Sequence, residues 1–351
     1  MSGVSLRTSG FVSPGQLKRL SRSQDERLRD IAFETVQSCA VEAHRRETEA
    51  NHIAGAGPNR RPGKARCVYD MEGGTRGLPG RLARDERGNV GTDEIVERTF
   101  ANMGLAYDFL SSTFGPQAVT GWASPMVCSV HYGNAVANAF WTGRQAVFGD
   151  GDGHYFLPFS RALDVVTHEL CHGVVRFSSN LEYAGEPGAL NESFCDVMGA
   201  LARQWHLGHA ADAADWLLGG DIVGPGLAVA ALRSFRETPV YQGHPALGDD
   251  DQPKHMNDFV TTVDDHGGVH ENVGIPNRAF HEAAMAIGGR AWESAGRVWY
   301  EAFTGLPSRS NFAAAAAATV ATASRLFSGS SREADAFRHA WNEVGIDPGG
   351  T

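Results

Sequence analysis

The residues with the clearest chemical potential lie in VVTHELCHGV, residues 165–174, where two histidines stand four residues apart and a glutamate follows the first. Residues four apart share one face of a helix, so His168 and His172 can present both imidazoles to one metal ion. Glu169 is rotated by about 100° from His168, so it can reach a water on that ion more easily than the ion itself. Zn²⁺ lowers the pKa of a bound water to about 7, and a carboxylate can then take its proton. The spacing predicts half of a zinc site, although two ordinary helix histidines give the same pattern.

A catalytic zinc also needs a third protein ligand and an open fourth position. The stretch GALNESFCD, residues 188–196, supplies a candidate in Glu192, and Asp196 follows it four residues later on the same helix face. We expect Glu192 to bind the zinc and Asp196 to accept the free ring N–H of a ligand histidine. The alternative is that both acids lie on a solvated helix face. Their apolar neighbours favour burial, and buried acids need partners.

The composition is that of a globular protein with an uneven charge. Hydrophobic residues make up 42% of the 351-residue chain, which is enough for two domains or one bilobed domain. The formal net charge of −10 argues against a nucleic-acid partner. Basic residues outnumber acidic ones in residues 1–66, whereas acidic residues dominate the remainder. This asymmetry is either incidental or marks a basic head that docks on an acidic body.

The cysteines and the first residues suggest a compartment. The cysteine count of 5 is odd and shows no C-x-x-C pair, so a disulfide scaffold is not expected. The N-terminus lacks the apolar core of a secretory signal, and no apolar run is long enough for a transmembrane helix. We therefore expect synthesis in the cytoplasm without a Sec signal, then either retention there or export by a non-classical route. No membrane partner is expected, and without an oligomer signal we expect a monomer.

Helix and strand patterns divide the chain into four segments. Residues 1–50 form a helical head with one or two helices, and residues 51–66 form a basic linker rich in Gly and Pro that a protease could cut. Residues 67–175 form a β-rich lobe that ends in the histidine helix, expected from residue 161. Residues 176–351 form a helical lobe.

Three further expectations concern single elements. Thr92 is expected to cap a helix over about 92–114, which has acidic residues in its first turn. The segment 126–153 is expected to hold two strands with turns between them. Near the C-terminus we expect an alanine-rich helix over 311–327 and a closing helical segment over 331–346, opened by a capping serine.

Several motifs in the same order resemble the thermolysin-like neutral metallopeptidases from about residue 67 to the C-terminus. They are HELCH with NESFCD, and the stretches at 138–141, 149–172, 232–235 and 264–277. The resemblance implies an α+β fold with a β-rich N-lobe, a mainly helical C-lobe and a cleft crossed by the histidine helix. It also implies a zinc endopeptidase that hydrolyses protein or peptide substrates through a zinc-bound water.

The same resemblance implies roles for individual residues. His168, His172 and Glu192 would bind one catalytic zinc, and Glu169 would be the general base. The oxyanion of the tetrahedral intermediate would be stabilised by His270, which Asp265 orients, and by Tyr183. Preorganised donors of this kind often supply the largest catalytic effect. The substrate backbone would be held by Asn138, Ala139 and Arg233.

The pocket on the leaving-group side would be apolar and would favour a hydrophobic substrate residue. Its lining would be Phe156, Phe159, Val165, Leu218, Ile222 and Leu232. The alternative is that these are simply core residues.

The chain departs from the family at the double calcium site of its larger relatives. Three acids remain in the stretches that match this site: Asp164, Asp215 and Asp221. Other positions that would hold acids in those relatives hold Arg203, Leu217 and Gly220 instead. A guanidinium can replace a cation by pairing with carboxylates. We therefore expect the double site to be absent and Arg203 to bridge Asp164 and Asp215. Weaker calcium binding elsewhere, for example near the GDGDG stretch at 149–153, stays open.

The head is the second departure. The stretch FVSPGQLKRL, residues 11–20, resembles the short prosegment of the protealysin-like subgroup, although it holds only the one proline, Pro14. We expect an inhibitory or folding prosegment that is removed by cleavage within the linker, and that the precursor carries as its own partner. Cys39 would be either a temporary zinc ligand or, more simply, a packed helix residue.

Two other function classes remain to be distinguished. A zinc-bearing binding module that no longer cuts would be expected to lose Glu169 first, yet this base is present. An aminopeptidase would share the two histidines and the later glutamate, but the chain shows no anchoring motif such as G-x-M-E-N. Digestion of a peptide with blocked ends separates the endopeptidase from the aminopeptidase.

Overall fold

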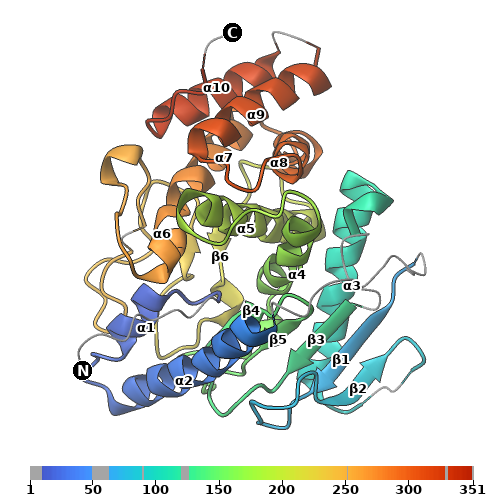
Figure 1. Ribbon diagram of the computed structural model, residues 1–351, viewed down its shortest axis with the longest axis vertical. Coiled ribbons are helices and arrows are strands. Elements are labelled where there is room, and N and C mark those ends of the chain that lie inside the picture. The colour runs from blue at the N-terminus through green and yellow to red at the C-terminus, as the bar shows by residue number, and fades with distance from the viewer. Residues whose placement is uncertain are drawn as a thin grey trace.

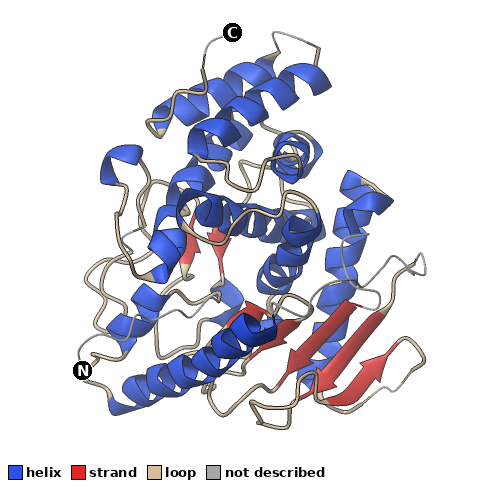
Figure 2. Ribbon diagram, in the orientation of Figure 1, coloured by secondary structure: helices blue, strands red, loops and turns tan. Residues whose placement is uncertain are grey.

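The computed structural model describes residues 10–49, 63–88, 91–119, 126–250, 252–328 and 331–349. A sheet-containing N-lobe and a helical C-lobe meet at the histidine helix, which confirms the expected α+β fold class (Figure 2). Most of the expected linker, 51–62, and the first nine residues lie outside the described residues. The expected cut within the linker stays a prediction.

The N-lobe is built on a five-stranded mixed sheet in the order β2-β1-β3-β5-β4. Its strands are β1 (Arg66–Asp70), β2 (Arg81–Asp85), β3 (Met126–Val130), β4 (Ala139–Trp141) and β5 (Ala146–Phe148). β3 runs parallel to both β1 and β5, while β2 and β4 run antiparallel to their neighbours. β4 therefore forms one edge of the sheet, with backbone groups available to another segment.

The segment 126–153 contains three strands where two were expected. The additional strand arises because β4 and β5 form a hairpin, with Phe140 opposite Val147. Gly143 has φ 94° in the connecting turn, a conformation that glycine adopts without steric cost. The short hairpin puts β4, which carries most of the motif at 138–141, at the edge of the sheet.

Helix α3 (Glu94–Phe114) packs against the sheet and carries an apolar face toward it (Figure 1). Its cap is Asp93 and not Thr92, because the Asp93 carboxylate accepts hydrogen bonds from the N–H groups of Ile95 and Val96. Both residue types are good caps, and the sequence alone did not separate adjacent candidates.

Helix α4 (Leu163–Phe177) carries the histidines and lies between the sheet and α5 (Gly185–Leu207), as Figure 1 shows. It begins at residue 163, two residues later than expected, because Phe159–Arg161 forms a separate 3₁₀ turn. Nearly all of α4 is buried, which explains why its sequence is apolar around the two histidines. α5 ends at Gly208, whose φ of 70° closes the helix in the left-handed region.

The C-lobe is mainly helical, as expected. Its other elements are β6 (Leu217–Leu218), β7 (Arg233–Ser234), α6 (Asp265–Asn272), α7 (Gly274–Ile287), α8 (Ala295–Thr304), α9 (Phe312–Leu326) and α10 (Arg332–Glu343). The alanine-rich α9 is capped by Asn311, and α10 is capped by Ser331. A stacked group of aromatic rings around Trp299 holds this lobe together.

The N-terminal head, residues 10–49 of the described chain, forms two helices, α1 (Pro14–Leu20) and α2 (Glu26–Glu49). Ser13 and Gln16 make a reciprocal capping box at α1, with Pro14 in the first turn. In Figure 1, α2 lies beside β4, and the cluster that joins Cys39 to Phe140 agrees with this. The head buries a row of apolar side chains, namely Phe11, Val12, Leu17, Leu20, Leu28 and Ile31. It is therefore packed as an integral part of this fold.

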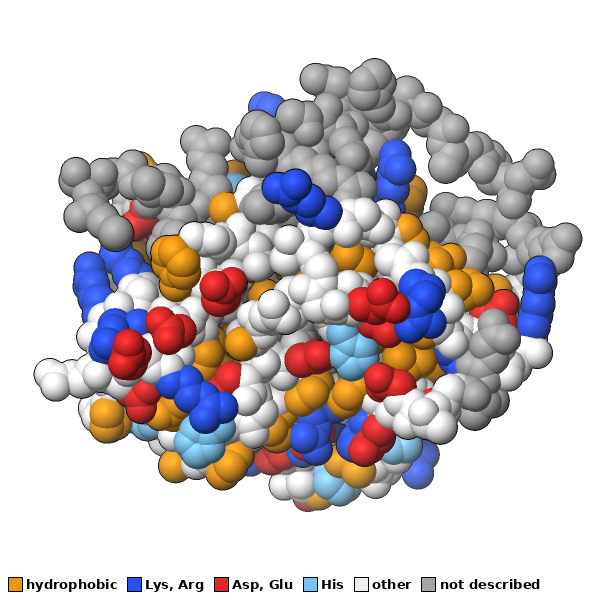
Figure 3. Space-filling view, turned by 90° about the horizontal axis from the view of Figure 1, so that it is seen from below, with side chains coloured by type: hydrophobic (Ala, Val, Ile, Leu, Met, Phe, Trp, Pro, Cys, Tyr) orange, Lys and Arg blue, Asp and Glu red, His pale blue; other side chains and the backbone are white. Residues whose placement is uncertain are grey.

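The outer surface carries charges of both signs. On the face in Figure 3, acidic and basic side chains are interspersed with hydrophobic ones, so the negative net charge is not gathered into one patch there. Within the described ranges, no helix combines the length and the apolar character that a membrane span requires.

Candidate active site

His168 and His172 on α4 meet Glu192 on α5, and ligand atoms of all three lie within 4.8 Å of one another. Nε2 of His168 lies 3.4 Å from Glu192 Oε2, and Nε2 of His172 lies 3.6 Å from Glu192 Oε1. Two imidazole nitrogens and a carboxylate oxygen are a donor set that suits zinc. The structure thus brings the three predicted ligands together.

The other ring nitrogen of each histidine also has a partner. Nδ1 of His168 lies 2.9 Å from Asp196 Oδ1, as predicted. Nδ1 of His172 lies 3.0 Å from Asn191 Oδ1, a partner that the sequence did not suggest. Such partners fix the tautomer with Nε2 free for a metal. A signal for Asn191 existed, because it is a polar residue among apolar ones directly before Glu192.

The pKa values of the two histidines in this cluster are shifted in opposite directions. Burial lowers the pKa of His172 to about 4, so its imidazole is neutral and ready to bind a metal. Burial also opposes the charged form of His168, but Asp196 and Glu192 raise its pKa to about 10. Glu192 Oε2 is buried and accepts no hydrogen bond from the described residues. A cation held by the two histidines would compensate this carboxylate, so the residues fit a metal ion.

A second group of predicted residues adjoins the cluster. The Asp265 carboxylate binds His270 twice, at the backbone N–H at 2.6 Å and at Nδ1 at 2.7 Å. The Tyr183 hydroxyl donates to Glu192 and lies 3.3 Å from His270 Nε2. Burial opposes a charged His270, yet Asp265 and Glu192 raise its pKa to about 9. His270 and Tyr183 are thus donors that adjoin Glu192 of the cluster.

The turn that places His270 uses an unusual backbone. Asp265 and His266 have positive φ values of 49° and 53°, and two glycines continue the left-handed run. Backbone of this kind is costly for residues with side chains and is found where function requires it. The side chain of His270 is buried, so it does not lie on the surface as a loop histidine often does.

Arg233 is held by the same carboxylate that supports His168. Its Nη1 lies 3.0 Å and 3.1 Å from the two oxygens of Asp196. Asn277 donates a further hydrogen bond of 2.9 Å to Asp196 Oδ2. Asn277 stood at the end of the stretch 264–277, but sequence reasoning gave it no role.

The head runs through the cleft between these groups. The N–H of Phe11 donates to the carbonyl of Ala139 at 2.9 Å, and its own carbonyl accepts from Arg233 Nη2 at 2.7 Å. The N–H of Val12 donates to Asn138 Oδ1 at 2.8 Å, and the Val12 carbonyl accepts from Asn138 Nδ2 at 3.3 Å. The three residues predicted to hold a substrate backbone therefore hold the backbone of the head.

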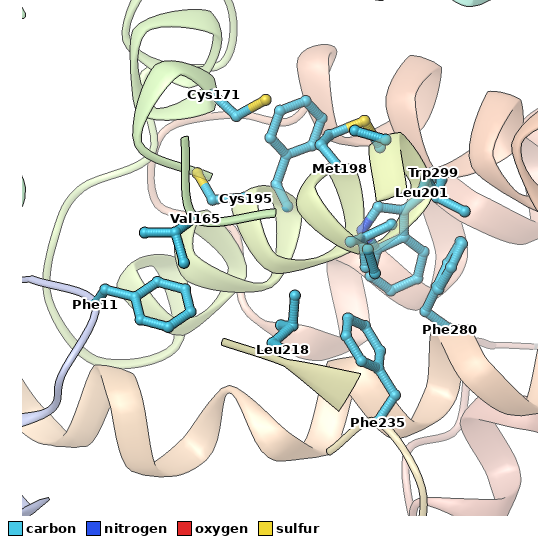
Figure 4. Close-up of a cluster of buried hydrophobic side chains, with 14 of the residues drawn as sticks. Phe11, Val165, Cys171, Cys195, Met198, Leu201, Leu218, Phe235, Phe280 and Trp299 are labelled. Atoms are coloured by element: carbon cyan, nitrogen blue, oxygen red, sulfur yellow. The ribbon is translucent and has the colours of Figure 1, made fainter. Parts of the chain in front are cut away.

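The Phe11 side chain enters an apolar recess beside the cluster. Figure 4 shows its ring pointing toward Val165 and Leu218, two of the predicted pocket residues. The ring centroid lies 5.3 Å from that of His168, and the guanidinium carbon of Arg233 stands 4.1 Å above the ring. The recess is thus next to the metal ligands.

The remaining predicted pocket residues are all buried: Phe156, Phe159, Ile222 and Leu232. Ile222 lies beside Phe11 at Gly219, where a Cβ would meet the Phe11 ring at 2.9 Å and Ile222 at 3.5 Å. Phe156 and Phe159 stack on each other with centroids 6.0 Å apart. Gly219 is a pocket residue that sequence reasoning missed.

The expected Arg203 bridge is formed on one side. Arg203 Nη1 lies 2.7 Å from both oxygens of Asp215. Asp164 instead accepts hydrogen bonds from the backbone N–H groups of Gly219 and Val165, and among the described residues no ion pair joins it to Arg203. Burial raises the pKa of Asp164, while the positive charge of Arg203 opposes that rise. The direct bridge to Asp164 was therefore wrong, because backbone donors already satisfy this carboxylate.

Cys39 does not take part in the metal cluster. It is buried in a small apolar group with Met71, Tyr132, Val136, Phe140 and Val147. Its sulfur accepts a weak contact of 3.8 Å from Asn138 Nδ2. The structure thus favours Cys39 as a packed helix residue and not as a temporary zinc ligand.

Comparison with known proteins connects this geometry to characterised families. Residues 56–176 match the family described as the thermolysin metallopeptidase catalytic domain, and residues 179–346 match the thermolysin metallopeptidase alpha-helical domain. An extracellular metalloprotease of Pectobacterium carotovorum subsp. carotovorum is 38% identical over 96% of each chain. Protease PrtS of Photorhabdus sp. (strain Az29) is 39% identical over 80% of this chain and 76% of its own.

A solved structure gives the same picture for the whole chain. The precursor of protealysin, a metalloproteinase from Serratia proteamaculans, aligns with a TM-score of 0.83 and 38% sequence identity. The alignment covers 96% of this chain and 99% of that one, so it includes a head in both.

The relatives correct one expectation. The Pectobacterium relative is named an extracellular metalloprotease, which points to secretion. The expectation of a protein that stays in the cytoplasm was therefore wrong. It rested on cysteine usage and on the lack of an apolar signal core, and neither reports the destination of a folded protease.

Proposed function

Because this chain belongs to the thermolysin family of metalloendopeptidases, we propose that it hydrolyses peptide bonds at one zinc ion bound by His168, His172 and Glu192. The observation that carries the proposal is the convergence of these three side chains beside a cleft that already holds a peptide segment. A zinc ion there would act as a Lewis acid and would make a water acidic enough to lose a proton near neutral pH.

In this proposal Glu169 is the general base. It is buried on α4 directly after His168, on a helix that packs against α5 along its length. A carboxylate in such a place can take the proton of the attacking water and later give it to the leaving amine. Because Glu169 lies within α4, the helix holds its backbone in place relative to His168 and His172.

His270 and Tyr183 stabilise the oxyanion of the tetrahedral intermediate. Asp265 accepts the Nδ1–H of His270, which leaves Nε2 on the cluster side with a raised pKa and hence a proton to donate. The Tyr183 hydroxyl lies 3.3 Å from that nitrogen, so both donors serve the same region. Donors that are positioned before the reaction need no reorganisation as charge develops.

The substrate binds as an added strand on β4. The head supports this assignment, because the Phe11 N–H donates to the Ala139 carbonyl on β4. The other backbone groups of Phe11 and Val12 bond to the side chains of Asn138 and Arg233. Edge-strand addition of this kind gives affinity through the backbone and specificity through alternate side-chain pockets.

The recess that holds Phe11 is the leaving-group pocket, and it selects hydrophobic residues. Phe11 is 1% exposed there, against Val165, Leu218, Gly219 and Ile222. Burial of a Phe side chain of this size is worth about 2–3 kcal/mol, whereas a charged residue would lose its hydration without a partner. Substrates with Phe, Leu or a similar residue after the cut bond are therefore preferred.

The head is an inhibitory prosegment. It occupies the pocket together with the Ala139 carbonyl and the side chains of Asn138 and Arg233, so no substrate can bind while it is docked. Polar contacts add to its apolar anchor: Arg27 Nε lies 2.6 Å from Asp152, and Gln16 donates to the Tyr241 hydroxyl at 3.0 Å. Residues 51–66 are proposed as the linker in which the precursor is cut, with self-cleavage as the route.

Processed protein and a peptide with both ends blocked test the endopeptidase. We expect a cut on the amino side of an internal Phe, loss of the activity with 1,10-phenanthroline, and recovery on addition of one equivalent of Zn²⁺. The control peptide carries Asp in place of that Phe. An aminopeptidase would leave the blocked peptide whole, and a binding module would retain it without cutting, so either result argues against the proposal.

The Arg203–Asp215 pair takes the place of the double calcium site in this proposal. We expect no shift in the midpoint of thermal unfolding between excess EGTA and millimolar calcium. Arg203→Ala lowers the free energy of unfolding by at most about 1 kcal/mol, because both side chains of the pair are about a third or more exposed. Strong calcium protection that Asp164→Asn or Asp215→Asn removes would contradict this.

A further inference from the structure

The head resembles a substrate on only one side of its Gly10–Phe11 bond. Phe11 and Val12 follow the path of leaving-group residues, with their backbone bound to Ala139, Asn138 and Arg233. In that register Gly10 stands where a substrate has the residue whose carbonyl is attacked. The following inference rests on the proposed function of the head as an inhibitor.

Gly10 is in a place that no side chain can enter. A Cβ on Gly10 would lie 2.7 Å from the Ala139 carbonyl oxygen, 2.7 Å from Asn138 Nδ2 and 2.9 Å from Asn138 Cγ. Gly10 is not one of the glycines with positive φ, so the restriction is one of space and not of backbone conformation. A residue with a side chain cannot follow this path unless Asn138 or Ala139 moves.

Neither of these two residues is free to move. Both are fully buried, and Asn138 Oδ1 accepts from the N–H groups of Val12 and Ala139 at 2.8 Å and 2.9 Å. The Ala139 carbonyl oxygen already accepts from the Phe11 N–H. A shift that made room at Gly10 would break the contacts that hold Phe11 and Val12 in place.

We infer that Gly10 makes the head an inhibitor instead of a substrate. Every substrate residue except glycine carries a Cβ at this position, so substrates with such a residue must follow another path before the cut bond. Hydrolysis would add one water, leaving a carboxylate on Gly10 and an amine on Phe11, but the bond lies on a path that substrates cannot use. Phe11 and Val12 of the head thus occupy the leaving-group part of the substrate site, while the Gly10–Phe11 bond is not hydrolysed.

Gly10→Ala tests this in the full chain with Glu169→Gln, which prevents self-processing. The measurement is binding of a dansyl-labelled Ala-Phe-Val amide to the cleft, followed by fluorescence. We expect Gly10→Ala to bind this peptide at least about tenfold more tightly than the parent, because the head competes less well. Equal exclusion of the peptide by Gly10→Ala and the parent overturns the inference.

Gly15→Ala is the matched control in the same head. A Cβ on Gly15 meets only the ends of flexible side chains, Glu271 Oε1 at 3.1 Å and Ser13 Oγ at 3.7 Å. Alanine is also favoured over glycine within α1, so this variant should exclude the peptide as well as the parent does. If Gly15→Ala opened the cleft as much as Gly10→Ala, the effect would be general loosening of the head, and the inference would fail.

A second measurement uses the active chain. Intact-mass analysis during maturation should find no product that begins at Phe11, and such a product would overturn the inference. Failure of the proposed function looks different: fully processed wild type with zinc bound would then cut no blocked peptide, whatever the Gly10 variants do.

Discussion

Glu169→Gln abolishes peptide hydrolysis while zinc stays bound. The amide keeps the size of the carboxylate but cannot accept the proton of water, so we expect kcat to fall by about 10²–10⁴-fold. His168, His172 and Glu192 are unchanged, so one zinc per chain should remain. Metal content and initial rates on a blocked peptide, measured on the same preparation, check both parts.

The variant also tests self-cleavage of the precursor. Freshly purified Glu169→Gln should keep its head over time, whereas wild type loses it, as followed by intact mass. Glu182→Gln is the control, because this glutamate lies just after α4 and pairs on the surface with Arg309. If Glu169→Gln lost its head at the wild-type rate, another protease would be responsible for processing.

Phe11→Ala releases the cleft before the linker is cut. Truncation of a fully buried Phe costs about 3–5 kcal/mol, so docking of the head should weaken at least about a hundredfold. We expect the uncut chain to hydrolyse a blocked peptide, where uncut wild type is latent. Initial rates on samples shown by mass to be full length give the result.

Phe33→Ala is the matched control, since Phe33 lies in the same head but is 57% exposed. It should stay as latent as wild type. Phe11→Leu keeps an apolar anchor and should restore most of the latency. If Phe11→Ala remained latent while folded by circular dichroism, the ring would not be the anchor of the inhibitor.

The metal cluster could be predicted from sequence because its geometry is local. Four-residue spacing on one helix fixes His168 and His172, and the same spacing relates Glu192 to Asp196. The pairing of the two helices then brings these faces together. The resemblance to a known family extended this to His270 and Tyr183, whose placement by an irregular turn and a loop no periodicity reveals.

Other features could not be predicted because they depend on segments far apart in the chain. Val12 bonds to Asn138, 126 positions away, and Phe11 bonds to Arg233, 222 positions away; neither spacing nor composition predicts these contacts. The absence of an ion pair between Arg203 and Asp164 could not be predicted for the same reason. The backbone N–H of Gly219 donates to the Asp164 carboxylate, and the sequence does not show which backbone groups will lie near a given side chain.

The carboxylate of Asp196 has a consequence for how this enzyme can change. One side chain supports the imidazole of His168, anchors Arg233 and receives the amide of Asn277. In the proposed mechanism, Arg233, which binds the peptide, and His168, which binds the zinc, therefore share the negative charge of Asp196. Substitutions at Arg233 that change peptide selectivity should also change the affinity for the metal ion. We therefore expect these two properties to change together and slowly in evolution. New selectivity is easier to acquire at the apolar recess, where a side chain can change without disturbing that charge.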